Sequence, residues 1–358
     1  MSEINTPTNY HDFRKRFLEG VQKQKLQLHS VQVRGLSPSG KPLFTDIAYS
    51  VINPQMPTLV HVSGVHGIEG YLGSNIQSSI LESEGLSIEK LQNLNVVFVH
   101  ALNPYGMSWY RRVNAHNVDL NRNYYRNEVE RPVNAEFDLF APLFEKRPAE
   151  KKWKIWKTVL FAILKMGFRK AAGAIAKGQY HQPESLFYGG SEIEPEIHDT
   201  LHFLQKILKG CKELYVIDVH SGLGRFGAES FILDGLQIEQ DEIFWKTTLE
   251  SELINPMVDK KYYRAEGTLA DAFRDHFSES KLLYIFEEFG TMSLYQVFKT
   301  LSHEHKTFLK LKLDRLRAFQ MIATFFPYGK GWRTKTTECG RLTYFKVFDS
   351  IAAINGRS

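Results

Sequence analysis

The sequence predicts an α/β fold in which helices cover both faces of a central sheet. Short apolar segments bounded by turn residues recur along the chain, and segments whose apolar residues have helical spacing lie between them. The predicted strands are 58–62, 95–99, 213–219 and 281–286, after a candidate edge hairpin of 31–33 with 47–51. The predicted helices are 73–84, 195–208, 269–276 and 294–326. This alternation is typical of a sheet that is buried on both faces.

Length and composition predict a globular protein of a reducing compartment. The chain has 358 residues, enough for one large α/β domain or two ordinary ones, and 43% of them are apolar. The net charge of +5 is too small to predict nucleic-acid binding. Two cysteines, Cys211 and Cys339, cannot form a disulfide framework. Residues 1–16 lack the apolar core of a signal peptide, and no apolar run is long enough to span a membrane. We therefore expect a cytoplasmic location.

A basic segment at 151–178 differs from the rest of the chain. It has no acidic residue and eight basic ones, namely Lys151, Lys152, Lys154, Lys157, Lys165, Arg169, Lys170 and Lys177. Its apolar residues have helical spacing, namely Trp153, Trp156, Val159, Leu160, Ile163 and Leu164. Such a helix can contact a membrane surface or an anionic partner. We favour the alternative that its apolar stripe packs on its own domain, because basic amphipathic helices are common on the surfaces of globular proteins.

Polar side chains follow each of the four predicted strands. In chain order these are His66 and Glu69, then Asn103, then Asp218 and His220, and finally Glu287 and Glu288. Ligands of open α/β sheets bind at the carboxyl ends of strands, so these residues form a candidate site. His66 and Glu69 are only three positions apart in a tight loop, where an imidazole nitrogen and a carboxylate oxygen can reach one cation. Nitrogen and oxygen ligands with room for water are typical of hydrolytic zinc sites.

Further motifs follow the His66–Glu69 pair in a fixed order. They are Asn103-Pro104-x-Gly106, Arg112, Asp119-Leu120-Asn121-Arg122-Asn123, Phe187-Tyr188-Gly189-Gly190 with Glu194-Pro195-Glu196, Asp218-Val219-His220-Ser221 and Glu288-Phe289-Gly290-Thr291. In this order the chain resembles the zinc carboxypeptidase family, the M14-type metallopeptidases, and most closely its bacterial DUF2817 branch. The resemblance spans roughly 59–294. It implies one catalytic α/β domain over 1–358 with a mixed, mainly eight-stranded twisted sheet flanked by helices. The basic helical insertion lies at about 145–180.

The resemblance also implies a metal centre. His66, Glu69 and His220 match the family's ligands for one Zn²⁺, which leaves a position for water and lowers the pKa of that water. Asp218, two residues before His220, is interpreted as a supporting or structural carboxylate rather than a ligand.

Two further positions match the family's catalytic residues. Glu288 matches the general base that takes a proton from water and passes it to the leaving nitrogen. Its neighbour Glu287 is the rival, but successive strand residues point to opposite faces, so only one of them can serve. Arg112 matches the arginine that stabilises the developing oxyanion, and Arg111 is its competitor.

Substrate contacts are implied for three residues. Asn121 and Arg122 match the pair that binds a carboxylate of the substrate, a task that suits the guanidinium fork. Tyr263 is the candidate for the family's mobile tyrosine, and Tyr262 is its alternative.

Together these features predict a zinc-dependent hydrolase of amide bonds that acts on small peptides in a carboxypeptidase-like reaction. One alternative is a deacylase of N-acyl amino acids, like the succinylglutamate desuccinylase and aspartoacylase relatives. The other is a metal-binding protein without catalysis. The sequence indicates no oligomeric state.

Overall fold

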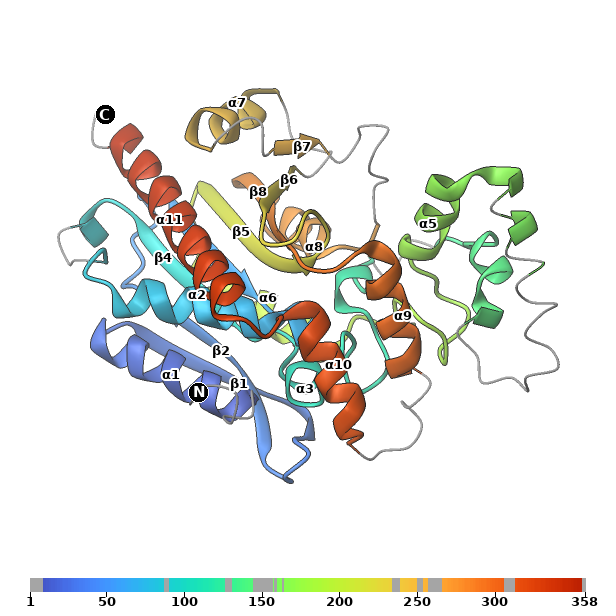
Figure 1. Ribbon diagram of the computed structural model, residues 1–358. Helices are drawn as coiled ribbons and strands as arrows, with labels where there is room; N and C mark the ends of the chain where they lie inside the picture. The colour runs from blue at the N-terminus through green and yellow to red at the C-terminus, as the bar shows by residue number, and fades with distance from the viewer. Residues whose placement is uncertain are drawn as a thin grey trace.

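A mixed eight-stranded sheet, in the order β1-β2-β4-β3-β5-β8-β6-β7, forms the centre of the computed structural model (Figure 1). The structure describes residues 9–86, 90–125, 131–143, 157, 160–162, 164–233, 239–249, 254–256, 266–305 and 313–355. The strands are β1 Gln27–Leu36, β2 Pro42–Tyr49, β3 Thr58–Ser63, β4 Asn95–His100, β5 Glu213–Gly222, β6 Glu229–Leu233, β7 Ile254–Pro256 and β8 Lys281–Gly290. All four predicted strands and the edge hairpin are confirmed.

The middle of the sheet is parallel and its edges are mixed. Strands β4, β3, β5 and β8 run parallel to one another, whereas β2 pairs antiparallel with β4 and β6 pairs antiparallel with β8. Every residue of β3 and β4 is buried, as expected for strands covered on both faces. Because the four parallel strands run in one direction, their carboxyl ends lie along one edge of the sheet. His66 and Glu69 follow β3 at this edge, whereas His220 and Glu288 lie within the last three residues of β5 and β8.

Helices cover the two faces of the sheet separately. Helices α1 Tyr10–Lys23, α2 Gly70–Glu82 and α11 Lys330–Asn355 share one apolar core with the sheet, and α6 Pro195–Ile207 and α8 Leu269–His276 share the other. Successive strand residues alternate between these cores: Leu59 lies in the first and Val60 in the second. The remaining helices are α3 Pro104–Ser108, α5 Phe168–Ala176, α7 Glu239–Thr248, α9 Leu294–His305 and α10 Arg315–Phe325.

The predicted helix 294–326 is in fact interrupted. Helices α9 and α10 share this stretch, and Asp314 caps the start of α10 by accepting hydrogen bonds from the backbone N–H groups of Leu316 and Arg317. Asp314 itself has extended backbone angles, so a continuous helix cannot pass through it. The prediction of one long helix was wrong at this point.

The basic segment packs on the domain only in part. In α5 the side chains of Ala171 and Ala174 are buried, but Leu160 and Leu164 of the preceding helical turns are 57% and 75% exposed. The expectation that the apolar stripe packs inward is therefore wrong for these two leucines. The other members of the stripe, Trp153, Trp156, Val159 and Ile163, lie outside the described residues. Within the described part of the chain, no helix combines the length and apolar character needed to cross a membrane.

Candidate metal centre

The loop after β3 places His66 and Glu69 close together. Gly64 has a φ of +73°, and the short 3₁₀ turn Gly67–Glu69 leads directly into α2. A Cβ at Gly67 would lie 2.2 Å from the backbone carbon of Gly106, so the two chain segments can approach this closely only at glycine. The predicted tight loop is therefore present, and both side chains on it are buried.

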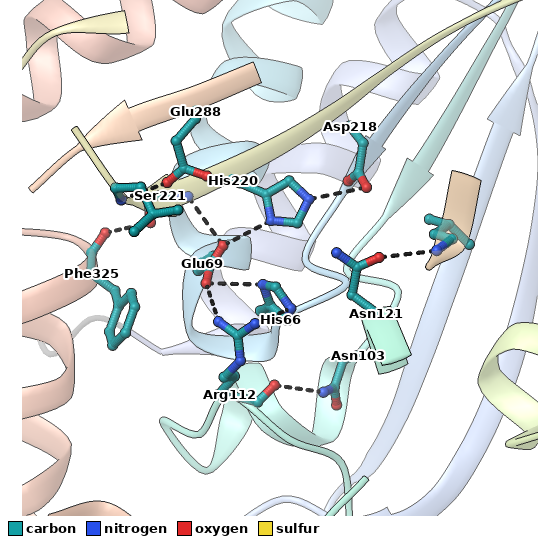
Figure 2. Close-up of polar contacts among 12 residues, drawn as sticks. His66, Glu69, Asn103, Arg112, Asn121, Asp218, His220, Ser221, Glu288 and Phe325 are labelled. Carbon is teal, nitrogen blue, oxygen red and sulfur yellow. Dashed lines mark hydrogen bonds and ion pairs between the residues drawn. The ribbon is translucent and has the colours of Figure 1, made fainter. Parts of the chain in front are cut away.

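His66, Glu69 and His220 meet in one buried cluster, with ligand atoms within 4.8 Å of one another (Figure 2). The carboxylate of Glu69 lies between the two imidazoles. Its Oε1 is 3.0 Å from His66 Nδ1, and its Oε2 is 3.2 Å from His220 Nδ1. The backbone N–H of Ser221 also donates to Oε2 at 3.1 Å. These three distant side chains thus lie together, as expected from the sequence, and their role as zinc ligands stays a prediction.

An aspartate lies behind each histidine. Asp119 Oδ1 is 3.2 Å from His66 Nε2, and Asp218 Oδ2 is 3.1 Å from His220 Nε2. The hydroxyl of Tyr284 donates to the same oxygen of Asp218 at 2.8 Å. At His220 a carboxylate at Nε2 favours the tautomer that carries its proton there, which leaves the Nδ1 lone pair available. At His66 the guanidinium of Arg112 also lies 2.6 Å from Nε2. Asp218 accordingly supports His220 and does not face Glu69.

The charges around the cluster suit a divalent cation. Burial alone would raise the pKa of the Glu69 carboxyl, but His66 and His220 hold that pKa below its usual range. Burial would lower the pKa of His220, yet Asp218 and Glu69 raise it well above its usual value. Neighbouring charges therefore stabilise both groups in their charged forms. A bound cation can take the place of the positive charge that the histidines now provide to Glu69.

The donor set itself fits zinc. Two imidazole nitrogens and one carboxylate form one of the ligand sets of catalytic zinc sites. His66 Nδ1 and His220 Nδ1 both face the Glu69 carboxylate, at 3.0 and 3.2 Å, so the three candidate ligand atoms point toward one another. Among the described residues, no other group of three or more His, Cys, Asp or Glu side chains converges in this way.

Glu288 belongs to this site and Glu287 does not. Strand β8 continues to Gly290 and so includes both residues, and Glu288 is the one paired across the sheet with His220. Its Oε1 accepts a hydrogen bond from the backbone N–H of Leu223 at 2.8 Å. Burial and the nearby Glu69 carboxylate raise the pKa of Glu288 to about 8. Glu287 is fully buried on the opposite face, where burial and the nearby Glu229 raise its pKa well above its usual value.

Arg112 faces the cluster, whereas its neighbour points elsewhere. Arg112 Nη1 lies 3.3 Å from Glu69 Oε1, and its Nε donates to Asp119 Oδ2 at 3.0 Å. Arg111 instead forms a buried ion pair with Glu304 on α9, with 2.5 Å between Nε and Oε1. Arg112 is therefore the arginine that lies at the cluster, and its oxyanion role stays a prediction.

The predicted substrate-binding residues have other contacts in this structure. Asn121 Oδ1 accepts the backbone N–H of Leu269 at 3.0 Å, which ties its loop to the start of α8. Arg122 is buried, and its Nη1 donates to the carbonyl of Asn121 at 2.6 Å. A role of this pair in binding a carboxylate stays a prediction. Tyr263 and its alternative Tyr262 lie outside the described residues.

Asp119 is the residue that motif reasoning left without a role. It is completely buried and contacts both His66 and Arg112, so it links the loop of the candidate ligands to the arginine. Its place directly before Leu120-Asn121-Arg122 was the available signal. A carboxylate inside a motif of otherwise functional residues is a candidate partner for a ligating histidine.

Comparisons with known proteins agree with this architecture. Residues 7–338 match the profile of the family described as "Protein of unknown function (DUF2817)". The chain belongs to the DUF2817 family. No curated protein sequence matches this DUF2817 protein.

Among solved structures, bovine thrombin-activatable fibrinolysis inhibitor in complex with tick carboxypeptidase inhibitor aligns with a TM-score of 0.53 and 11% identity over 97% of each chain. A second structure of thrombin-activatable fibrinolysis inhibitor has a TM-score of 0.49 at 10% identity, covering 96% of this chain and 74% of that one. A metallo-carboxypeptidase from Burkholderia cenocepacia has a TM-score of 0.44 at 11% identity, covering 95% of this chain and 69% of that one. At such low identity the bovine alignment shows a shared fold alone, and the DUF2817 protein thus has a carboxypeptidase-like α/β fold.

Proposed function

We propose that the protein is a zinc-dependent hydrolase of amide bonds with carboxypeptidase-like chemistry. The observation that carries this proposal is the convergence of His66, Glu69 and His220 beside a buried glutamate of raised pKa, Glu288. The carboxypeptidase-like fold supports it, because the cluster lies at the carboxyl ends of the parallel strands, where such folds bind their ligands.

His66, Glu69 and His220 would hold the ion. Zinc in this environment supplies Lewis-acid polarisation and lowers the pKa of water. Asp119 and Asp218 orient the two imidazoles from behind, and Ser221 fixes one oxygen of Glu69 through its backbone N–H. The ligands are thus held by groups that do not themselves need to move.

Glu288 would move the proton. Without a metal the pKa of Glu288 is raised to about 8, and its proton would be displaced once the neighbouring ligands hold a cation. The ionised carboxylate can then accept a proton from water and return it to the leaving nitrogen. Arg112 presents a guanidinium next to Glu69, where it can donate to an oxyanion as negative charge develops on the attacked carbonyl oxygen. Asn121 and Arg122 would bind a carboxylate of the substrate, and Tyr263 is the proposed mobile contact.

A substrate panel tests this function. The protein loaded with zinc would be assayed on short peptides with free C-termini and on N-acyl amino acids, because both classes carry a carboxylate next to an amide. We expect one zinc per chain, release of C-terminal residues, and loss of turnover on chelation that zinc restores. Cleavage of N-acyl amino acids alone would assign the deacylase reaction instead. Zinc binding without turnover of either class would leave a metal-binding protein and refute the catalytic proposal.

A matched pair of variants controls for folding. Glu69→Gln removes a proposed ligand, whereas Glu19→Gln changes an exposed glutamate on α1. We expect only Glu69→Gln to lose zinc and turnover.

A further inference from the structure

The helical turns before α5 present their large apolar side chains to solvent. Leu160, Phe161 and Leu164 are 57%, 69% and 75% exposed, whereas Ala162 between them is 5% exposed. Residues three and four positions apart lie on one side of a helix, so the three large side chains form a continuous ridge. A helix that only covers its own domain does the reverse: it buries its large apolar residues and exposes its small or polar ones.

Basic residues accompany this apolar ridge (Leu160, Phe161 and Leu164) in the sequence. Lys165 follows Leu164 directly, and Lys170 and Lys177 are exposed along α5 and at its end. The whole stretch 151–178 carries eight basic residues and no acidic one, although the complete chain has a net charge of only +5. The positive charge is therefore concentrated in the part of the sequence that contains the exposed apolar side chains.

We propose that the apolar ridge and its lysines dock the protein on an anionic lipid bilayer. Apolar side chains that enter the boundary between headgroups and acyl chains, together with lysines that reach lipid phosphates, are the two features of interfacial helices. The sequence adds Trp153 and Trp156 just before the ridge, and tryptophan is enriched at the level of lipid headgroups.

A bilayer fits this surface better than a second copy of the chain. Two copies facing each other through the ridge would bring together two clusters of lysine, and like charges across an interface oppose association. An anionic bilayer instead offers negative charge over its whole surface and accepts apolar side chains without a complementary groove.

The docking surface is tied to the body of the protein near the candidate site. Asn134 donates hydrogen bonds to the carbonyls of Ala174 and Gly178, each at 2.7 Å. A side chain at Gly178 would come within 3.1 Å of Arg122 Cδ, so the end of the basic segment packs against a predicted substrate-binding residue. Figure 1 shows α5 at the outer edge of the molecule, beyond α9 and away from α1. Docking through the ridge thus engages an outward edge of the molecule.

Vesicle flotation tests the proposal with the full-length protein. We expect flotation with vesicles of phosphatidylcholine that contain about 30% phosphatidylglycerol, weak flotation with pure phosphatidylcholine, and loss of binding at high salt. Leu160→Gln/Phe161→Gln/Leu164→Gln is expected to weaken binding at least about tenfold through lost apolar insertion. Lys165→Gln/Lys170→Gln/Lys177→Gln is expected to weaken it about a hundredfold, at about fivefold for each lysine near an anionic surface.

Matched variants elsewhere on the surface are the controls. Lys25→Gln/Lys41→Gln/Lys209→Gln removes three exposed lysines, and Leu36→Gln/Val51→Gln/Ile243→Gln changes three exposed apolar residues. We expect both to bind vesicles like the wild type.

Four outcomes would overturn the proposal. They are equal binding to both kinds of vesicle, no binding to either, binding that the ridge variants leave unchanged, and a dimer in sedimentation velocity that the apolar variant alone dissociates. The last would assign the ridge to contacts between copies. Since flotation needs no substrate, the result is independent of the proposed hydrolase activity.

Discussion

His220 on β5 and Glu288 on β8 are direct neighbours across two parallel strands. Paired residues of adjacent strands point to the same face of a sheet, so a proposed metal ligand and the proposed base project together toward Glu69. The preceding pair, Val219 and Glu287, points to the other face. The position of the base relative to the ligand is therefore fixed by strand register and not by a loop.

Replacing the proposed base should abolish turnover without removing the metal. In Glu288→Gln the amide keeps the size of the side chain but cannot accept the proton, and we expect kcat/KM to fall by about 10²- to 10⁴-fold. Zinc content and hydrolysis would be measured on the same preparation. Glu287→Gln is the matched control because it changes the adjacent carboxyl on the opposite face, and it should retain turnover. A zinc-loaded Glu288→Gln protein with full activity would rule out this base.

Zinc affinity should rise with pH. In the metal-free protein the pKa of Glu288 is raised to about 8 and that of His220 well above its usual value. Both groups therefore hold a proton near neutral pH that a divalent cation displaces, and binding releases protons. Competition with a chelator of known affinity, between about pH 5 and pH 8, measures the slope of the logarithm of the binding constant against pH.

The two glutamate variants separate the contributions to this slope. Glu288→Gln lacks one of the displaced protons, so its slope should be smaller than that of the wild type by up to about one. Glu287→Gln should match the wild type. Equal slopes in all three proteins would show that Glu288 does not exchange a proton with the metal site.

The aspartates behind the histidines should tune metal affinity. Asp218→Asn keeps the shape of the side chain but weakens the interaction with His220 Nε2, and we expect zinc affinity to fall about 10- to 100-fold. Tyr284→Phe removes only the hydroxyl that donates to Asp218, so its effect should be smaller. Affinities measured by calorimetry would contradict this assignment if Tyr284→Phe lost more than Asp218→Asn.

Substitutions of the two adjacent arginines, Arg111 and Arg112, should have different effects on turnover. Arg112→Lys keeps the charge beside Asp119 and Glu69 but loses the fork of donors, so we expect kcat to fall about 10²-fold. Arg111→Lys can still pair with Glu304, away from the cluster, and should keep turnover near the wild-type level. Steady-state kinetics on both variants makes the comparison. The reverse result would move the oxyanion contact to Arg111.

Local sequence patterns predicted the strands and the residues at their ends. They did not predict the contacts between distant segments that support the candidate ligands. The buried apolar runs of β3 and β5 could be recognised because both faces of these strands are covered, and the short spacing of His66 and Glu69 identified their loop. Asp119 was missed because its contact with His66 joins segments far apart in sequence, and no local period reports such a contact.

Helical periodicity in the sequence failed to predict one helix and the direction in which another apolar face points. The C-terminal helix α11 was not predicted, although its buried residues recur at helical spacing, because polar Thr336 and small Gly340 stand at two of the inward positions. For Leu160 and Leu164 the spacing correctly indicated an apolar face. It could not show that this face points away from the domain, since that depends on tertiary packing.

The pH dependence of the unfolding free energy should reveal the buried carboxyl of Glu287, which lies on the face of the sheet opposite Glu288. Burial and the nearby Glu229 on β6, which also shares a side-chain hydrogen bond with Glu287, raise the pKa of Glu287 well above its usual value. A carboxyl whose pKa is raised on folding binds its proton more tightly in the folded state. Its contribution is fully present below the unfolded pKa of about 4.5 and is lost as pH rises through the folded value.

Glu287→Gln does not lose stability in this way as pH rises, because the amide does not ionise. At pH 9 we expect the unfolding free energy of the metal-free variant to exceed that of the wild type by about 1–3 kcal/mol. At pH 5 the two proteins should differ little. Urea unfolding at both pH values measures the difference, and Glu19→Gln on the surface of α1 should track the wild type. Glu288 titrates in both proteins and so cancels in the comparison. A Glu287→Gln protein that is less stable than the wild type at pH 9 would mean that the Glu287 carboxyl is stabilised by its surroundings in the ionised form.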